Sequence, residues 1–372
     1  MKKIIPLIIV FICFFSFGAD AQTPSGDEFY YEQYKESGAD ALDDALPDST
    51  KEFFLENGIT PESGSLSEFL SAENVFSHIW NFIKSGAKTP FISGISVLGV
   101  IFISAAVNGW SNTASEKAVQ FATVISAVSV IAVPVSSVIT ASVSAMKGCS
   151  AFMFSFIPVF AAVNAAAGNA ATSVASSGLL LLATQAVSFI ANFVVIPLMG
   201  GYLAISISAS VSPLVSSSGI AEGIKKLSMW IMSLTSTVFI GVISIQTTLS
   251  AAADSLSVKT AKFIIGSAVP VAGTALSEAL TTVTASMGTL RASVGIYGVI
   301  ACAVIFLPLL AELFLWRIAL VALGSVSSLF SLGRLSSVFK GVDSVMSVLI
   351  GVILLILAVF IISLTLVVGA AK

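Results

Sequence analysis

Residues 345–368 read VMSVLIGVILLILAVFIISLTLVV and contain no charged side chain. A helix needs about 20 predominantly apolar residues to cross the roughly 30 Å hydrocarbon core of a bilayer. Comparable apolar stretches follow one another from Pro90 onward, separated only by short polar joints. Hydrophobic residues make up 56% of the 372-residue chain and charged residues only 10%, which is more apolar surface than a water-soluble fold of this size buries. The sequence therefore predicts an all-α, polytopic transmembrane helix bundle.

The apolar pattern predicts about seven membrane-crossing helices in a domain that covers residues 78–372. The predicted spans are 90–109, 119–143, 150–167, 178–211, 227–249, 293–316 and 345–368. The fourth span is long for one crossing and contains Pro197, Gly200 and Gly201. These three residues are candidate helix breaks, and we expect a tilted, kinked or broken helix there.

Segment 263–285 is apolar enough to enter a membrane but poorly suited to face lipid. It contains Pro270, Gly273, Glu278 and several threonines, and Pro270 and Gly273 are further candidate helix breaks. Irregular backbone at membrane depth is tolerated only where protein or a water-filled cavity shelters it. We therefore expect a re-entrant or bundle-buried element in addition to the seven spans.

The amino-terminal residues have the features of a cleavable signal peptide. Lys2 and Lys3 precede an apolar stretch over 4–17, and residues 19–21 fit the A-x-A cleavage pattern. We predict a signal peptide over residues 1–21 with cleavage after Ala21; the alternative is an uncleaved signal anchor. In both cases the residues that follow lie on the extracytoplasmic side.

Residues 22–77 form an acidic region, with thirteen acidic and two basic side chains, whereas residues 78–372 carry thirteen basic and six acidic ones. The sequence thus predicts a small acidic extracytoplasmic head on a basic membrane domain. Such a head either docks a basic partner or remains a solvated, partly helical spacer.

Lysine and arginine usually concentrate in cytoplasmic loops, but seven crossings from an extracytoplasmic start do not reproduce that bias. This count places Lys117, Lys259, Lys262, Arg291 and Lys372 in the cytoplasm. It leaves Lys147, Lys225, Lys226, Arg334 and Lys340 outside. Splitting 178–211 into two crossings only exchanges the groups, so charge alone does not fix the topology.

Charged residues within apolar segments are costly and are often functional. A helix over residues 249–263 would have two distinct faces. One face would carry Ser255, Lys259 and Lys262, and the other would carry Leu249, Leu256 and Phe263. We expect the leucine face to pack on the bundle and the lysine face to serve as a gate or docking surface; snorkelling lysines on an interfacial helix are the alternative. The candidate conduit or partner-contact residues are Asp254, Ser255, Lys259, Lys262, Glu278 and Arg291.

Two further carboxylates have competing interpretations. Glu278 is a candidate intramembrane functional group, or it caps a helix or pairs with Arg291. Glu312 and Arg317 lie beside Trp316 at the end of an apolar span, so we expect both to snorkel to the interface; a proton or ion relay is the alternative.

Motifs for enzyme chemistry are missing from the sequence. It contains no P-loop, dinucleotide fingerprint, H-E-x-x-H or G-x-S-x-G motif, and its single histidine, His78, excludes a His-based zinc site or a Ser-His-Asp triad. The basic residues are scattered, which does not favour nucleic-acid binding. We therefore expect no enzyme activity, no catalytic or metal-binding residues and no cofactor.

Several short stretches are similar to a known family. They are GVISIQ at 241–246, AAAD at 251–254, KTAKFIIG at 259–266, VPV at 269–271 and SVGIYG at 293–298. With them, the region from Phe91 to the carboxyl terminus resembles the stage III sporulation protein AE family.

The resemblance implies a multi-pass protein of the mother-cell membrane that surrounds the forespore in endospore-forming bacteria. It implies partners among the other membrane and ring proteins of the same operon, its secretion-type ATPase and a forespore membrane protein. Together these would form a channel, or feeding tube, in which this chain is the permease-like or platform subunit. The alternative is a self-sufficient secondary transporter for a small solute, with broken helices near Pro197 and Pro270 and Glu278 in the membrane.

Overall fold

The computed structural model describes residues 34–35, 37–60, 66, 69–108, 113–167, 169–211, 218–268 and 273–369, with the backbone alone over most of 253–286. The predicted signal peptide and Pro270 lie outside the described residues. The described part of the chain consists of helices and short connections and contains no strand, which confirms the all-α class.

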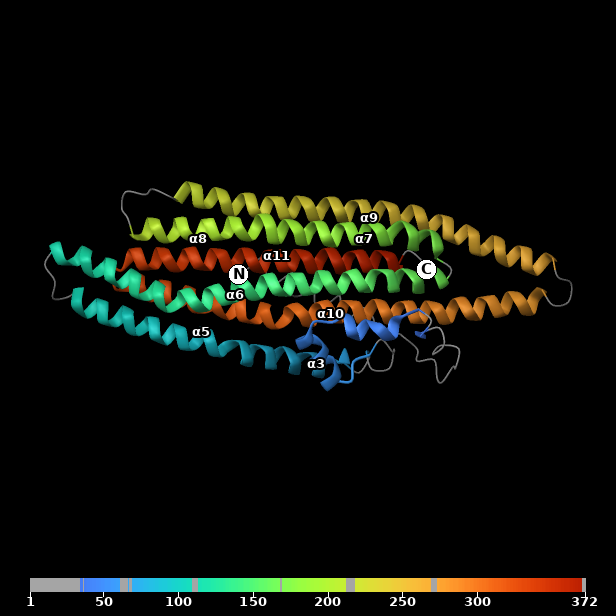
Figure 1. Ribbon diagram of the computed structural model, residues 1–372, viewed down its shortest axis with the longest axis horizontal. Helices are drawn as coiled ribbons and strands as arrows, with labels where there is room; N and C mark the ends of the chain where they lie inside the picture. Colours follow the sequence, from blue (N-terminus) through green and yellow to red (C-terminus); the bar gives the residue numbers. More distant parts are fainter. Residues whose placement is uncertain are drawn as a thin grey trace.

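Six long antiparallel rods form the bundle (Figure 1). They are α5 (Ala72–Asn108), α6 (Thr113–Ala166), the run of α7 (Ala170–Ile190), η2 (Ala191–Val195) and α8 (Ile196–Val211), then α9 (Ser218–Ala268), α10 (Gly273–Leu329) and α11 (Gly333–Gly369). Among the described residues, the short helices η1 (Ala39–Ala45) and α3 (Asp48–Glu56) precede them. Among the described residues, six helical segments are long and apolar enough to cross a membrane, which confirms a polytopic bundle.

Two of the expected spans, 119–143 and 150–167, are parts of the single helix α6. The polar joint expected between them, Lys147 and Gly148, lies inside this helix because neither residue ends one: lysine is a good helix former and one glycine costs only about 1 kcal/mol. The 54 residues of α6 extend about 80 Å, whereas the hydrocarbon core of a bilayer is roughly 30 Å thick. The rod therefore projects well beyond a membrane.

The irregularity expected in 178–211 is a π-helical turn rather than a break. Pro197 has no N–H, and its ring crowds the carbonyl four residues earlier, at Phe193. Phe193 lies in the π-helical η2, where the wider turn accommodates this crowding. Gly200 and Gly201 continue helix α8 without interruption. The third rod is thus π-helical over 191–195 and α-helical on either side.

The described residues around 263–285 do not form a separate re-entrant element. They are the last turns of α9 and the first turns of α10, and Gly273 is the first residue of α10. In Figure 1 these ends extend beyond the other rods at the right-hand side. Outside 269–272, the small and apolar residues of this segment simply extend two long helices.

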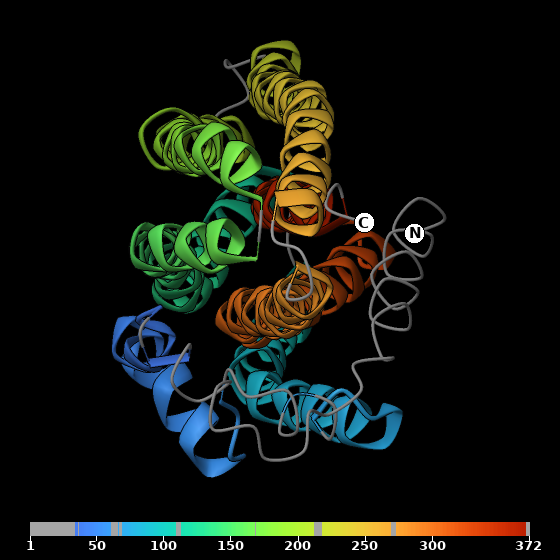
Figure 2. The same ribbon diagram turned by 90° about the vertical axis from the view of Figure 1, so that its right-hand side faces the viewer.

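Helices α10 and α11 form the centre of the bundle, as the end-on view in Figure 2 shows. In the most apolar stretch of α10, 67% is buried inside the protein, whereas the corresponding share for the peripheral α9 is 22%. Around the outside, large apolar side chains such as Phe91, Val133 and Leu182 are exposed. An exposed apolar shell around a packed centre is expected for a protein whose outer surface contacts lipid.

Residues 34–60 pack against this bundle. The side chains of Leu42 and Phe54 are fully buried, and the ring of Phe54 lies edge-on to that of Tyr297 on α10, with 5.3 Å between centroids. The Tyr297 hydroxyl also donates a hydrogen bond to the Asp43 carboxylate. The described part of the acidic segment is therefore attached to the bundle through apolar and polar contacts.

The connections between the rods divide into two groups. At one end, at the left of Figure 1, α5 meets α6, α8 meets α9 and α10 meets α11. We call this the basic end, because its helices carry Lys117, Lys225, Lys226, Arg317, Arg334 and Lys340. Residues 34–60 lie toward the opposite end, where α6 meets α7 and α9 meets α10.

Candidate functional site

The structure places the predicted conduit residues on the two projecting rods. Asp254, Ser255, Lys259 and Lys262 belong to α9 and Glu278 belongs to α10, and the side chains of all five lie outside the described residues. The helix expected over 249–263 is confirmed, so positions 255, 259 and 262 share one face of the backbone.

One expectation about the opposite face is wrong. Leu249, which we expected to pack on the bundle, is 69% exposed. Its neighbours along α9, Leu234, Val238, Val242 and Ile245, are also exposed. Apolar residues on a peripheral rod in a membrane have no need to face protein, because lipid is as apolar as the bundle interior. Amphipathic periodicity therefore does not identify the packed face of α9.

Arg291 is the predicted site residue whose side chain the structure describes. It is only 6% exposed on α10, and its Nη1 donates a hydrogen bond to Oδ1 of the buried Asn164 on α6, at 3.3 Å. A buried cation needs acceptors because burial removes its water. Glu278 precedes Arg291 by 13 residues, or about 20 Å along the continuous α10, which is too far for the ion pair considered above.

Sequence reasoning missed Asn164 as the partner of Arg291. Asn164 lies in a run of small residues that indicates close helix packing but no particular contact. The pair links α6 to α10 near the end where residues 34–60 lie. Chemically it supplies a fixed, hydrogen-bonded cation and not an acid–base pair.

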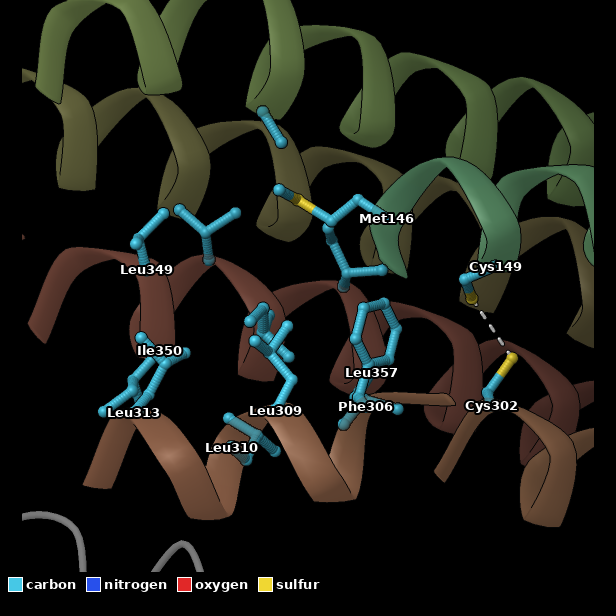
Figure 3. Close-up of a cluster of buried hydrophobic side chains, with 14 of the residues drawn as sticks. Met146, Cys149, Cys302, Phe306, Leu309, Leu310, Leu313, Leu349, Ile350 and Leu357 are labelled. Carbon is cyan, nitrogen blue, oxygen red and sulfur yellow. Dashed lines mark hydrogen bonds between the residues drawn. The ribbon is translucent and has the colours of Figure 1, made fainter. Parts of the chain in front are cut away.

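Between Arg291 and the basic end, apolar side chains fill the space among α6, α10 and α11 (Figure 3). The Cys149 and Cys302 sulfurs lie 3.3 Å apart as free thiols, beside Met146 and Phe306. At Gly298, an added Cβ would overlap the ring of Phe156 on α6. Helices α6 and α10 thus approach as closely as a glycine allows.

The basic end contains an ion pair between the two central helices. Arg317 Nε on α10 lies 2.8 Å from Asp343 Oδ1 on α11, and the two side chains are 24% and 22% exposed. Trp316 is fully buried rather than placed at an interface. The expectation that Arg317 snorkels beside Trp316 is therefore wrong: 26 residues separate Arg317 from its partner, and only the α10–α11 hairpin brings them together.

Comparisons with known proteins match the chain to one family. A family model described as Stage III sporulation protein AE matches residues 67–371. The stage III sporulation protein AE of Bacillus subtilis (strain 168) is 25% identical over 230 residues, which cover 58% of this chain and 57% of that relative. No solved structure matches the chain.

The family match begins just before α5 and covers all six rods, so it includes the whole bundle described above. It also includes the sequence stretches 241–246, 251–254, 259–266 and 293–298 on α9 and α10. A match of this extent shows that the chain belongs to the stage III sporulation protein AE family.

Proposed function

We propose that this chain acts in endospore development as a non-catalytic membrane subunit of the channel complex between mother cell and forespore. The observation that carries the proposal is the family match over residues 67–371, which includes every rod of the bundle. In this proposal the chain lies in the mother-cell membrane, as the permease-like or platform component. Its partners are other stage III sporulation proteins, including ring proteins, a secretion-type ATPase and a forespore membrane protein.

We further propose that the basic end faces the cytoplasm. The helices of the basic end carry six lysines and arginines, whereas the segment 22–77, whose described residues 34–60 lie toward the other end, has thirteen acidic and two basic residues. Lysine and arginine concentrate on the cytoplasmic side of membrane proteins. If the chain starts outside and crosses the membrane once with each of the six rods, one side receives Lys117, Lys225, Lys226, Arg334 and Lys340 together, and that side is the cytoplasm. The count of seven crossings divided these residues between the two sides.

This topology is tested by cysteine labelling in a background that lacks the native thiols. A membrane-impermeant maleimide should label Leu55→Cys, a site 72% exposed in α3, on protoplasts without permeabilisation. It should label the exposed Ser331→Cys, between α10 and α11, only after permeabilisation. The reverse pattern would invert the proposed orientation.

The role in sporulation is tested on α9. Deleting the gene should allow engulfment and then arrest forespore development, and a deletion strain with normal heat-resistant spores would refute the proposal. Reversing both lysines, Lys259→Glu with Lys262→Glu, should reduce heat-resistant spores as far as the deletion does, while immunoblots show unchanged protein in the membrane.

Lys226→Glu is the matched control, since it reverses an exposed lysine on the same helix at the opposite end. It should sporulate normally. A self-sufficient transporter would instead move solute into liposomes without partners. Solute flux by the purified wild-type protein, together with normal sporulation of the double variant, would favour that alternative.

A further inference from the structure

A pocket of about 700 Å³ opens at the basic end between α8, α9 and α11. Three basic side chains line it: Lys225 from α9, and Arg334 and Lys340 from α11. Its hydroxyl groups come from Tyr202, Ser206, Ser210, Ser337 and Ser344. We call this cavity the basic-end pocket. It lies apart from the α9–α10 projection on which the conduit residues were predicted.

The local fold fixes the pocket wall formed by α11. Ser331 adopts a left-handed φ of 58°, and the Leu332 N–H donates to the Ser327 carbonyl at 2.9 Å, so the chain reverses tightly before α11 begins at Gly333. Positions 334, 337, 341 and 344 then recur on one face of α11. At Gly341 an added Cβ would lie 2.9 Å from the Cβ of Ser206, so α8 and α11 meet closely at the pocket's edge.

The charges in the pocket are not balanced by the described residues. Nζ of Lys225 lies 3.3 Å from the Ser344 hydroxyl, and no ion pair within the described chain includes Lys225, Arg334 or Lys340. Glu222 also lines the cavity but pairs with Lys226 at 3.5 Å. Asp343, the nearest carboxylate along α11, is engaged by Arg317. The segment 212–217 adds no acidic residue.

Three cations with several hydroxyls suit one class of ligand, a phosphate anion. The arginine guanidinium donates to phosphate oxygens in a bidentate manner, lysine supplies compact positive charge, and serine hydroxyls complete the hydrogen bonds. The amino terminus of α11 contributes further positive potential at Gly333. A cavity of about 700 Å³ is also within the size range of small-molecule sites.

The surroundings of the pocket favour a lipid as the source of that phosphate. On α9, Ile220 and Trp230 flank Lys225 in the sequence and are 64% and 62% exposed. Exposed apolar residues there offer a surface for acyl chains, and tryptophan is typical of the headgroup level of a membrane. Basic pockets between transmembrane helices bind anionic lipid headgroups in other membrane proteins.

We propose that the basic-end pocket binds the phosphate group of an anionic phospholipid. Lys225, Arg334 and Lys340 hold the phosphate oxygens, and the acyl chains lie along the exposed apolar surface of α9. This inference does not depend on the role in sporulation or on which end faces the cytoplasm.

The test uses the purified full chain in detergent and measures both thermal stability and bound lipid by native mass spectrometry. Three probes are compared: phosphatidylglycerol in mixed micelles, phosphatidylcholine in mixed micelles, and inorganic phosphate. We expect phosphatidylglycerol to raise the melting temperature and to remain bound, and phosphatidylcholine to do neither. Stabilisation by inorganic phosphate alone would retain the phosphate site but assign it to a soluble anion.

The decisive variant is Arg334→Gln combined with Lys340→Gln, since both side chains lie outside the packed core. Removing two charges should weaken phosphatidylglycerol binding about 30-fold. Lys147→Gln is the control: this lysine on α6 is exposed, does not line the pocket, pairs with none of its residues and should leave binding unchanged. Equal binding by wild type and the double variant, or no binding of either phosphate probe, would overturn the proposal.

Discussion

The middle of the bundle and its basic end use space in opposite ways. Around Phe156 and Gly298, α6 and α10 are so close that a single added carbon has no room. At the basic end, α8, α9 and α11 surround a cavity of about 700 Å³ lined by charged and hydroxyl groups. Steric fit therefore dominates the first region, and electrostatics and hydration dominate the second. A substitution that adds volume should be severe in the middle, and one that removes charge should matter mainly at the basic end.

The largest effect is expected at Gly298. Gly298→Leu would drive a side chain into the Phe156 ring, and overpacking of this kind costs about 3 kcal/mol. Neither helix can move away freely, because the hydrogen bond from Arg291 to Asn164 links α10 to α6 farther along the bundle. We expect membrane abundance to fall to a small fraction of wild type, measured by fluorescence-detected size exclusion.

Gly241→Leu is the control for added volume, because no atom outside the local backbone of α9 lies within 4 Å of a Cβ built at this position. It should accumulate normally. If both leucine variants accumulate equally, the contrast between a filled middle and an open periphery does not hold.

An intermediate effect is expected for the ion pair of Arg317 with Asp343. Both side chains are about three-quarters buried, so removing one partner leaves the other charge poorly solvated. Asp343→Ala should lower stability by about 2 kcal/mol, seen as a melting temperature several degrees lower in detergent.

A charge exchange separates electrostatics from packing at this position. Arg317→Asp combined with Asp343→Arg should recover most of the lost stability if the pair acts through its charges. The exposed pair Glu222 to Lys226 provides the comparison, since Glu222→Ala should change stability by less than about 0.5 kcal/mol. A double variant as unstable as Asp343→Ala would show that shape, not charge, governs this contact.

The class of fold follows from the sequence because apolar runs of spanning length leave no other solution. The number of rods does not follow, and Lys147 is the reason. A lysine followed by glycine is typical of a loop between spans. In the structure, however, the Lys147 side chain is exposed on the surface of α6, and the helix continues through it. Predicting a loop at Lys147 adds one membrane crossing, and this extra crossing reverses the side of the membrane assigned to each later loop. The basic residues consequently fell into two incompatible groups.

The polar contacts were less accessible than the helices. Arg317 and Asp343 are 26 residues apart, and Arg291 and Asn164 are separated by 127. No periodicity within one helix connects such pairs; they require the order in which the rods pack. The basic-end pocket has the same origin, since Lys225 and Lys340 come from different rods that meet only in the fold. Sequence reasoning found the charged residues, but it could not group them.

The smallest effect is expected for the ion pair of Lys51 with Asp44, outside the membrane-spanning segments, where both side chains meet solvent. The hydrogen bond from the Lys51 ammonium, and then its charge, lower the pKa of the Asp44 carboxyl, and the same contact raises the pKa of Lys51. The pair therefore stabilises the fold above the unfolded Asp pKa of about 4 and below the unfolded Lys pKa of about 10.4.

That contribution is lost as the pH falls through the lowered pKa of Asp44, or rises through the raised pKa of Lys51. Asp44→Asn should melt slightly below wild type at pH 7 and low salt, by much less than Asp343→Ala. The difference should disappear once the pH falls below the lowered pKa of Asp44, and also in high salt, because protonation or screening removes the same interaction from wild type. A difference that persists at low pH would mean that Asp44 acts through hydrogen bonding that does not require its charge, and the contrast between exposed and buried ion pairs would then need another cause.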